Sequence, residues 1–325
     1  MKYKKPLNEH TILVSINGTI GNIGTYSNEQ IILGKSACYF NITPFLVKEY
    51  MCYVIESNYF QKYALLSATG STIKNVPLKA IYEFYVPIPP VSEQKRIVSE
   101  TDYLLAFINK VEEGKENLQN TVQSAKSKIL DLAIHGKLVP QDPNDEPASE
   151  LLKRINPKAE ITCGNPQYSK LPKGWCLCKI SSVVDIVNGK SQKNVESPTG
   201  KYPIYGSGGI IGKAMEYTCL AGSTIIGRKG TINHPIFVEE NFWNVDTAFG
   251  MKANNQILED KYFYCFCLYF DFSKLDKSSA LPSLTKTAIG NLILPIPPLA
   301  EQQRIVAKIE ELFSQLDKIE SSLQA

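Results

Sequence analysis

The sequence predicts an α+β protein in which a strand-rich domain followed by a long helix occurs twice. Three observations carry this prediction. Residues 87–98 (PIPPVSEQKRIV) and 295–306 (PIPPLAEQQRIV) are identical at nine of twelve positions, at an offset of 208 residues. Before each motif, short apolar segments are broken by Gly, Asn and Pro, which is typical of strands joined by turns. After each motif, apolar residues recur at helical spacing.

The first strand-rich region, residues 1–90, matches only the later part of the second, residues 171–298. Residues 12–20 resemble residues 224–232 at an offset of 212, which places residue 1 opposite a position near residue 213. We therefore expect residues 171–298 to form a complete domain and residues 1–90 a partial one. The partial domain would lack the counterpart of about 40 residues. Because missing strands leave sheet edges unpaired, we expect it to be the less stable of the two.

Each Pro-rich motif ends a strand region, since three prolines in four residues cannot lie inside a helix. The long helices are predicted at 91–136 and 299–325, the first spanning roughly 60 Å. Their apolar residues follow steps of four and three, the pattern of a coiled coil. On the repeat alignment the second helix stops about 16 residues before the first one does. The predicted seam consists of Ile97, Leu104, Ile108, Val111, Leu118, Val122, Ile129, Leu132, Ile305, Ile309, Leu312, Leu316, Ile319 and Leu323.

An amphipathic helix needs a partner for its apolar stripe. The other long helix is the obvious partner, and the alternative is that each helix packs on its own domain. Between the first helix and the second domain, residues 137–170 form a polar, Pro-containing linker, in which we expect one short helix at Ala148–Ile155.

The composition is that of an ordinary globular protein, with 43% hydrophobic and 21% charged residues. The start lacks the apolar core of a signal peptide and no apolar run is long enough to span a bilayer, so we expect a cytoplasmic protein. Eight Cys are too few for a disulfide scaffold in 325 residues. The Cys176/Cys178 and Cys265/Cys267 pairs lack the usual zinc spacing, so we expect core thiols and no metal site.

No catalytic motif of the common enzyme classes is present in the sequence, and we expect no catalytic residues. Residues 165–168 (NPQY) resemble the loop of adenine methyltransferases, but they lie in a Pro-rich linker with no preceding strand. Residues 206–212 (GSGGIIG) resemble a dinucleotide fingerprint, but the sequence that follows reads as a strand, whereas the fingerprint requires a helix. We interpret this segment as a glycine-rich loop whose N–H groups are able to approach phosphate.

Basic and polar residues cluster near glycines in the second domain, although the net charge is only +3. Such loops suit phosphate contacts by Lys and base-edge contacts by Arg, Ser, Thr or Asn. The residues alone leave an ordinary solvated surface equally open. The DNA-binding candidates are Lys190, Lys193, Ser207, Gly208, Arg228, Lys229, Thr231, Ser283, Thr285 and Lys286, with Asn17 and Lys74 at comparable places in the first repeat.

The duplicated P-I-P-P-x-x-E-Q-x-R-I-V motif, the linker that begins GKLVPQDPNDEP and the LPKGW segment at 171–175 together resemble the specificity subunit of type I restriction–modification systems. The resemblance covers essentially the whole chain. It implies two mixed α/β target recognition domains, each reading one half of a split site in double-stranded DNA. It also implies that the two long helices pack antiparallel and set the distance between the half-sites.

The resemblance further implies partner proteins. DNA methyltransferase subunits would dock on the helices and carry S-adenosylmethionine, while restriction subunits would add ATP- and Mg-dependent translocation and cleavage. The chain itself would then need no cofactor and contact no membrane. The alternatives are a coiled-coil adaptor that binds other proteins, an inactive or phase-variable form of the specificity subunit, and a free-standing methyltransferase.

Overall fold

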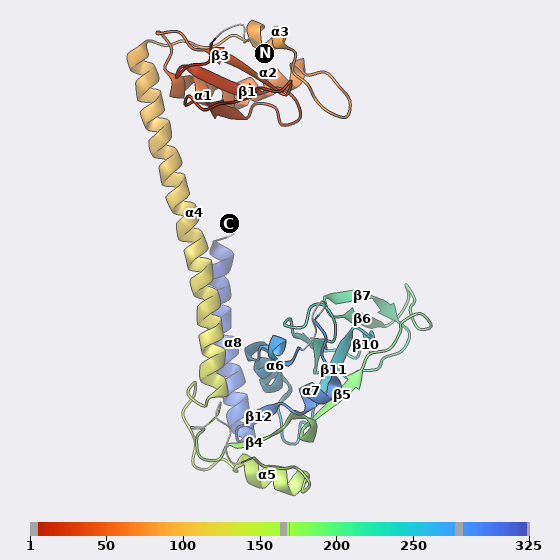
Figure 1. Ribbon diagram of the computed structural model, residues 1–325. Helices are drawn as coiled ribbons and strands as arrows, with labels where there is room; N and C mark the ends of the chain where they lie inside the picture. Colours follow the sequence, from red (N-terminus) through yellow and green to blue (C-terminus); the bar gives the residue numbers. More distant parts are fainter. Residues whose placement is uncertain (1–5, 163–167, 169, 277–281, 324–325) are drawn as a thin grey trace. The chain divides into compact units, whose positions relative to one another are not determined.

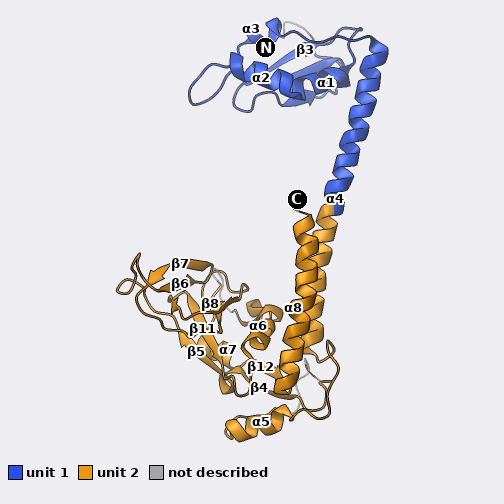
Figure 2. Ribbon diagram, turned by 180° about the vertical axis from the view of Figure 1, so that it is seen from behind, with its two compact units in different colours: residues 1–114 blue, residues 115–325 orange. Residues whose placement is uncertain are grey.

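The computed structural model describes residues 6–162, 168, 170–276 and 282–323. The chain divides into two compact units, residues 1–114 and 115–325 (Figure 2). The division falls inside one long helix, α4 (Val91–Ile134), next to Gly114. Each unit is described by itself below. The domain boundaries expected from the sequence stay predictions.

Unit 1 is built on a three-stranded antiparallel sheet in the order β2-β1-β3 (Figure 1). Ile12 of β1 lies opposite Phe40 of β3. Ile12 and Val14 are buried in an apolar core to which helices contribute Ile55 and Phe60. The elements before α4 are β1 (Thr11–Ser15), β2 (Ile23–Thr25), β3 (Ala37–Asn41), α1 (Lys48–Glu56), α2 (Asn58–Ser67) and α3 (Leu78–Glu83).

Unit 2 contains three sheets among its described residues, ordered β5-β11-β8-β9, β10-β6-β7 and β12-β4. The central strands β8 and β11 are almost wholly buried, which is why their sequences, STIIG and AFGMKA, are apolar or small apart from the half-buried Lys252. The strands are β4 (Cys176–Lys179), β5 (Val184–Asn188), β6 (Tyr202–Gly206), β7 (Gly209–Ala214), β8 (Ser223–Gly227), β9 (Ile236–Val238), β10 (Trp243–Asn244), β11 (Ala248–Ala253) and β12 (Ile293–Ile296).

The helices of unit 2 cover these sheets and continue their core. Tyr262, Phe263 and Phe266 on one helix are fully or nearly fully buried against the strands. The helices are α5 (Ala148–Ile155), η2 (Ile180–Ser182), α6 (Asp260–Tyr269), η3 (Phe272–Leu275), α7 (Lys286–Gly290) and α8 (Leu299–Ser322), together with the last part of α4. None of the helices in the described ranges is long and apolar enough to cross a membrane.

The last part of α4 packs antiparallel to α8 within unit 2 (Figure 1). The Lys126 ammonium donates to the carboxylates of Glu320 and Asp317 at 2.8 and 2.7 Å. Near the other end of α8, the Gln141 amide, just after α4, donates to Glu301 at 2.8 Å. The predicted antiparallel arrangement of the two helices is therefore present in this unit.

The burial of the predicted seam changes along α4. Val122, Ile305 and Ile309 are buried, and Ile129, Leu132, Leu312, Leu316 and Leu323 are half-buried. The residues earlier in α4 are exposed, and so is Ile319: Ile97 38%, Leu104 49%, Ile108 50%, Val111 54%, Leu118 41% and Ile319 41%. The lengths explain the difference, because α8 has 24 residues against 44 in α4, and Glu320 near its end already lies opposite Lys126. A coiled coil over the earlier part of α4 stays a prediction.

The short helix expected in the linker is confirmed with the same bounds, Ala148–Ile155. The first long helix ends two residues earlier than expected, at Ile134. Gly136 then adopts a left-handed φ of 66°, and a Cβ there would lie 2.4 Å from Pro172. Trp175 of the LPKGW segment donates from Nε1 to Glu301 at 3.1 Å, which ties this segment to the beginning of α8.

The internal repeat is confirmed by the order of elements. At the offset of 212, β8 corresponds to β1 residue for residue, and α6 corresponds to α1. At the offset of 208, α8 and α4 begin at equivalent residues, Leu299 and Val91. The sheet order β2-β1-β3 of unit 1 likewise matches β9-β8-β11 of unit 2.

Both repeats also fasten their long helix by the same buried glutamine. In unit 2, Gln302 donates from Nε2 to the carbonyls of Ile257 and Pro297, both at 2.9 Å, and its Oε1 accepts from the N–H of Glu259 at 2.7 Å. Gln302 is fully buried. One side chain thereby joins the helix to the Pro-rich turn and to the loop before α6.

Gln94 makes the equivalent three bonds in unit 1. Its Nε2 donates to the carbonyls of Phe45 and Pro89 at 2.9 and 2.8 Å, and its Oε1 accepts from the N–H of Val47 at 2.7 Å. The glutamine of the repeated E-Q motif thus has a structural role, which explains why it occurs at both positions.

Candidate nucleic-acid interface

Five of the candidate residues of unit 2 lie on two loops that leave the same end of the four-stranded sheet. The last residues of β5 and β8, Asn188 and Gly227, pair with the first residues of β11, Phe249 and Ala248. The loops after β5 and after β8 therefore emerge side by side. The first carries Lys190 and Lys193, and the second carries Arg228, Lys229 and Thr231.

The loop after β8 is held by a second segment of the chain, and we call this pairing the loop clasp (residues 228–230 with 282–284). Lys229 and Ser283 form an antiparallel bridge. The N–H of Leu284 donates to the carbonyl of Arg228 at 2.9 Å, and that of Gly230 donates to Pro282 at 3.2 Å. Because these bonds satisfy the backbone, the side chains of Arg228 and Lys229 remain available for other contacts.

The glycine-rich hairpin lies against the same loop. A Cβ on Gly227 would lie 3.1 Å from Cβ of Ser207 and 1.9 Å from the carbonyl oxygen of Thr231, so only glycine permits this approach. Ser207 and Gly208 form the turn between β6 and β7, and no helix follows them. The interpretation as a glycine-rich loop is confirmed, and a dinucleotide fingerprint is excluded.

The side chains at this end of the sheet are mostly basic. Lys190, Lys193 and Lys229 are exposed, and Arg228 is half-buried with its guanidinium 6.0 Å from the centroid of the Phe249 ring. This distance is at the outer limit of a cation–π contact. An exposed carboxylate, Asp246, lies in the turn just before β11.

Two predicted candidates already have partners within the chain. The Thr285 hydroxyl caps α7 by accepting from the N–H of Ala288 at 3.1 Å. The Lys286 ammonium donates to the carbonyl of Ile186. Both side chains are anchored within the protein by these bonds, which favours a structural role over DNA contact.

Unit 1 contains the same loop clasp with different residues. Asn17 and Asn75 form the bridge equivalent to Lys229 and Ser283. The N–H of Gly18 donates to the carbonyl of Lys74 at 3.1 Å, and that of Val76 donates to the carbonyl of Ile16 at 2.8 Å. Gly18 and Gly230 share the same left-handed φ, 77° and 78°. The structure thus brings the predicted pair Asn17 and Lys74 together.

Sequence reasoning missed Thr247, whose carbonyl accepts from the N–H groups of Arg228 and Lys229 at 2.8 and 3.3 Å. No local signal marks this residue, because the contact depends on how β11 pairs with β8. The clasp itself had a signal. In the internal repeat, the offset of 212 aligns Asn17 with Lys229, and the offset of 208 aligns Asn75 with Ser283. The structure pairs these residues in the same way in both units.

Cys176, Cys178 and Cys265 are buried in apolar surroundings that disfavour the thiolate. Burial raises the pKa of Cys176 to about 11 and that of Cys178 to about 12. Burial likewise raises the pKa of Cys265 to about 12. A metal ligand or nucleophile needs the opposite shift. The described residues also include no group of three or more His, Cys, Asp or Glu able to hold a metal ion.

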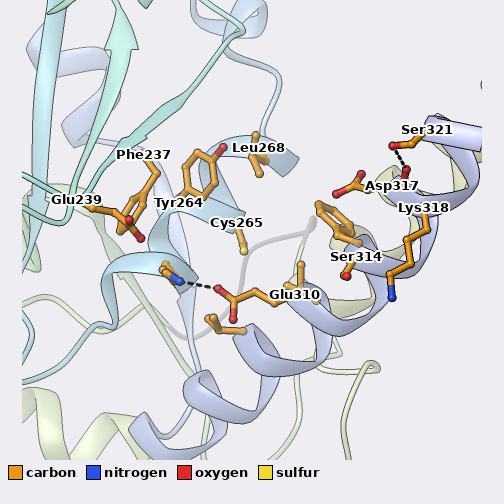
Figure 3. A pocket seen from close by; sticks show the side chains of 14 residues that line it. Phe237, Glu239, Tyr264, Cys265, Leu268, Glu310, Ser314, Asp317, Lys318 and Ser321 are labelled. Carbon is orange, nitrogen blue, oxygen red and sulfur yellow. Dashed lines mark hydrogen bonds and ion pairs between the residues drawn. The ribbon is translucent and has the colours of Figure 1, made fainter. Parts of the chain in front are cut away.

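A cavity lies between α6 and α8. It has a volume of about 680 Å³, and its side chains include Phe237, Tyr264 and Leu268 (Figure 3). Two of the charged groups that line it are paired, since the Lys261 ammonium donates to Glu310 at 2.6 Å. Of the methyltransferase-like NPQY segment, residues 165–167 lie outside the described residues, and Tyr168 is buried.

These features define a class of protein: a duplicated α+β scaffold that presents different side chains on one repeated loop framework. Comparison with known families identifies the type I restriction modification DNA specificity domain, Methylase_S, over residues 2–120 and 172–325. The chain belongs to this family. The resemblance seen in the sequence is thereby confirmed.

Curated relatives agree with this assignment. The specificity subunits of the EcoAI and EcoEI type I restriction enzymes of Escherichia coli are 25% and 22% identical to the chain, over 84% and 98% of its length. The matched regions cover 60% and 68% of those two proteins, so the chain corresponds to part of the relatives' length.

Solved structures share the fold. One is a chain of a type I R-M system studied for its complex assembly and conformational transition, with a TM-score of 0.70 at 18% identity over 98% of this chain and 77% of that chain. Another is the HsdS subunit from Thermoanaerobacter tengcongensis, with a TM-score of 0.58 at 16% identity over 97% and 75%.

Proposed function

We propose that this chain is the DNA-recognition subunit of a type I restriction–modification complex. The loop clasp carries the proposal, because it occurs in both units with the same backbone bonds and different side chains. Where unit 2 presents Lys229 and Ser283, unit 1 presents Asn17 and Asn75. A constant framework with exchanged side chains is what a protein needs to read two different half-sites in one molecule.

The chemistry of the two clasps suits a division between phosphate and base contacts. In unit 2 the exposed Lys190, Lys193 and Lys229 provide charges for the phosphate backbone. Arg228, whose guanidinium lies over the Phe249 ring, provides a fork of donors suited to a guanine edge. In unit 1 the amides of Asn17 and Asn75 are suited to an adenine edge.

The long helices support the assembly role. α4 carries exposed apolar side chains, among them Phe107 at 55%, Ile108 at 50% and Val111 at 54%. Exposed apolar surface on a helix favours contact with another protein. We propose two kinds of partner. DNA methyltransferase subunits would supply S-adenosylmethionine chemistry, and restriction subunits would supply ATP- and Mg-dependent translocation. The complex would act in the cytoplasm. This chain would contribute recognition and no catalytic residue.

The proposal is tested by measuring binding of the purified chain to duplex DNA across a range of salt concentrations. We expect affinity to fall as a power of the salt concentration, since bound phosphates release counterions. Lys229→Ala should weaken binding to all sequences and reduce the salt slope by about one. Lys153→Ala, which removes an exposed lysine of α5, is the matched control and should leave the slope unchanged.

A coiled-coil adaptor remains the second candidate function, favoured only by the exposed apolar residues of α4. Absence of duplex binding at every salt concentration, together with retained binding of a protein partner, would favour it over the proposal.

A further inference from the structure

The hairpin formed by β6 and β7 of unit 2 ends beside the loop clasp (Figure 1). Its turn, Ser207 and Gly208, lies against the loop after β8, as described above. On the preceding strand, a Cβ on Gly206 would lie 3.9 Å from Oγ1 of Thr247, whose carbonyl accepts from the N–H of Arg228. The tip of the hairpin is therefore continuous with the candidate nucleic-acid interface.

The base of this hairpin is held by the segment that precedes it. The N–H of Ser197 donates to the carbonyl of Lys213 at 2.9 Å, and the N–H of Met215 donates to the carbonyl of Val195 at 2.9 Å. The turn region, residues 206–209, reads GSGG and has no large side chain. Unit 2 thus presents a narrow ribbon that is fixed at its base, which lowers the entropic cost of binding a ligand.

Two apolar side chains next to this turn are exposed. Ile210 and Ile211 are 62% and 56% exposed. The pairing of β6 with β7 shifts here, because Tyr205 pairs with Ile210 whereas Ile204 pairs with Gly212, which leaves Ile211 as the extra residue of a β-bulge. Bulges often re-aim side chains next to binding sites. Two adjacent isoleucines that the core does not use favour a contact outside the chain.

The charges around the isoleucines favour a nucleic acid as the partner. Residues 206–212 contain no carboxylate. One exposed carboxylate, Glu196, lies beside Gly212, further from the turn. Against it stand four exposed lysines, two on the loop after β5, one just before β6 and one within β7: Lys190, Lys193, Lys201 and Lys213. An apolar tip with ammonium groups beside it suits a ligand that has apolar groups between phosphates.

The size of the apolar pair also favours DNA over a protein. A stable protein interface buries about 800 Å² on each partner, much more than two isoleucine side chains provide. A two-stranded ribbon fits the major groove of DNA, which is about 12 Å wide, and the apolar group presented there is the thymine methyl. The minor groove is about 6 Å wide and presents no methyl group.

We propose that the β6–β7 hairpin enters the major groove of one half-site, where Ile210 and Ile211 contact thymine methyl groups. This inference rests on the proposed function and adds an apolar, specificity-determining contact to the polar contacts of Arg228 and Lys229. The contact distinguishes an A·T pair by its methyl group. Because it involves no charge, it does not add to the salt dependence of binding.

The probe for the test is a duplex that carries the motif methylated when the chain is coexpressed with a methyltransferase subunit. In two further duplexes, deoxyuridine replaces every thymine of one half-site or of the other, which removes only the methyl groups. The full chain should bind one of these two duplexes about fourfold or more weakly than the thymine duplex, the factor expected for one buried methyl group.

Two variants place this effect on the hairpin. Ile210→Ala/Ile211→Ala should bind the thymine duplex about fourfold or more weakly than the unsubstituted chain, no longer distinguish it from that deoxyuridine duplex, and keep the same salt slope. Leu220→Ala is the matched control and should keep the full discrimination. Leu220 is 52% exposed and precedes β8, at the end of that strand opposite to the loop clasp.

The outcomes separate this inference from the proposed function. Equal binding of all three duplexes by the unsubstituted chain would overturn the inference alone, and so would full discrimination by the Ile210→Ala/Ile211→Ala variant. Absence of binding to every duplex would contradict the proposed function and this inference with it.

Discussion

Single polar side chains show where sequence reasoning reached its limit. Lys286 and Thr285 have the residue types expected of a DNA contact, yet the ammonium of one donates to the carbonyl of Ile186 and the hydroxyl of the other caps α7. Ile186 lies 100 residues away in sequence, so no local pattern could reveal that bond. Arg228 and Lys229 make no such side-chain hydrogen bond to the described residues and stay the better candidates for DNA contact.

The buried glutamine of the repeated motif yields a prediction at this scale. Gln302→Leu should destabilise unit 2 by about 3 kcal/mol, because the substitution leaves one buried N–H and two carbonyls without their partner. The neighbouring Gln303 is exposed, and Gln303→Leu should change stability by less than about 0.5 kcal/mol. Urea denaturation of both variants measures the difference, and equal midpoints would show that the three bonds contribute nothing.

The pairing of α4 with α8 yields a prediction at the scale of elements. Val122 is 2% exposed against α8, whereas Val111 in the same helix is 54% exposed. Val122→Ala should therefore lower the free energy of unfolding by about 1–2 kcal/mol, and Val111→Ala by less than about 0.5 kcal/mol.

Thermal denaturation of the isolated chain compares the two variants directly. A matched substitution in one helix holds helix propensity constant, so the difference reports packing alone. If both variants lost the same stability, the seam would extend along α4 as the sequence predicts, and the exposure of Val111 would need another explanation.

The elements themselves were largely predictable from the sequence. The Pro-rich motif marks where α4 and α8 begin, and Ala148–Ile155 matches its predicted bounds. The spacing of apolar residues does not show where a partner helix ends, which is why the whole stripe from Ile97 onward reads as one seam. The loop clasp is also invisible to local patterns, since it joins Lys229 to Ser283 across α6 and its flanking loops.

At the scale of the whole molecule, the two units differ in how their sheets end. β3 is the last strand on its side in the described part of unit 1, while the equivalent β11 lies between β5 and β8. A smaller sheet with a smaller core opens locally at a lower free energy. Amide exchange of the full chain should therefore be faster at residues 11–15 of β1 than at the equivalent residues 223–227 of β8. Equal protection at both would contradict the account of unit 1 as the less stable unit.

The central claim is that the loop clasp of unit 2 reads one half of a two-part DNA site. Coexpression of the chain with a methyltransferase subunit from its own genome, followed by genome-wide mapping of methylated adenines, tests this most directly. The account predicts a methylated motif of two specified halves separated by a fixed spacer, with Arg228→Ala relaxing one base position in one half and Arg154→Ala leaving the motif unchanged. A single uninterrupted motif, or a motif that Arg228→Ala leaves unaltered, would contradict it.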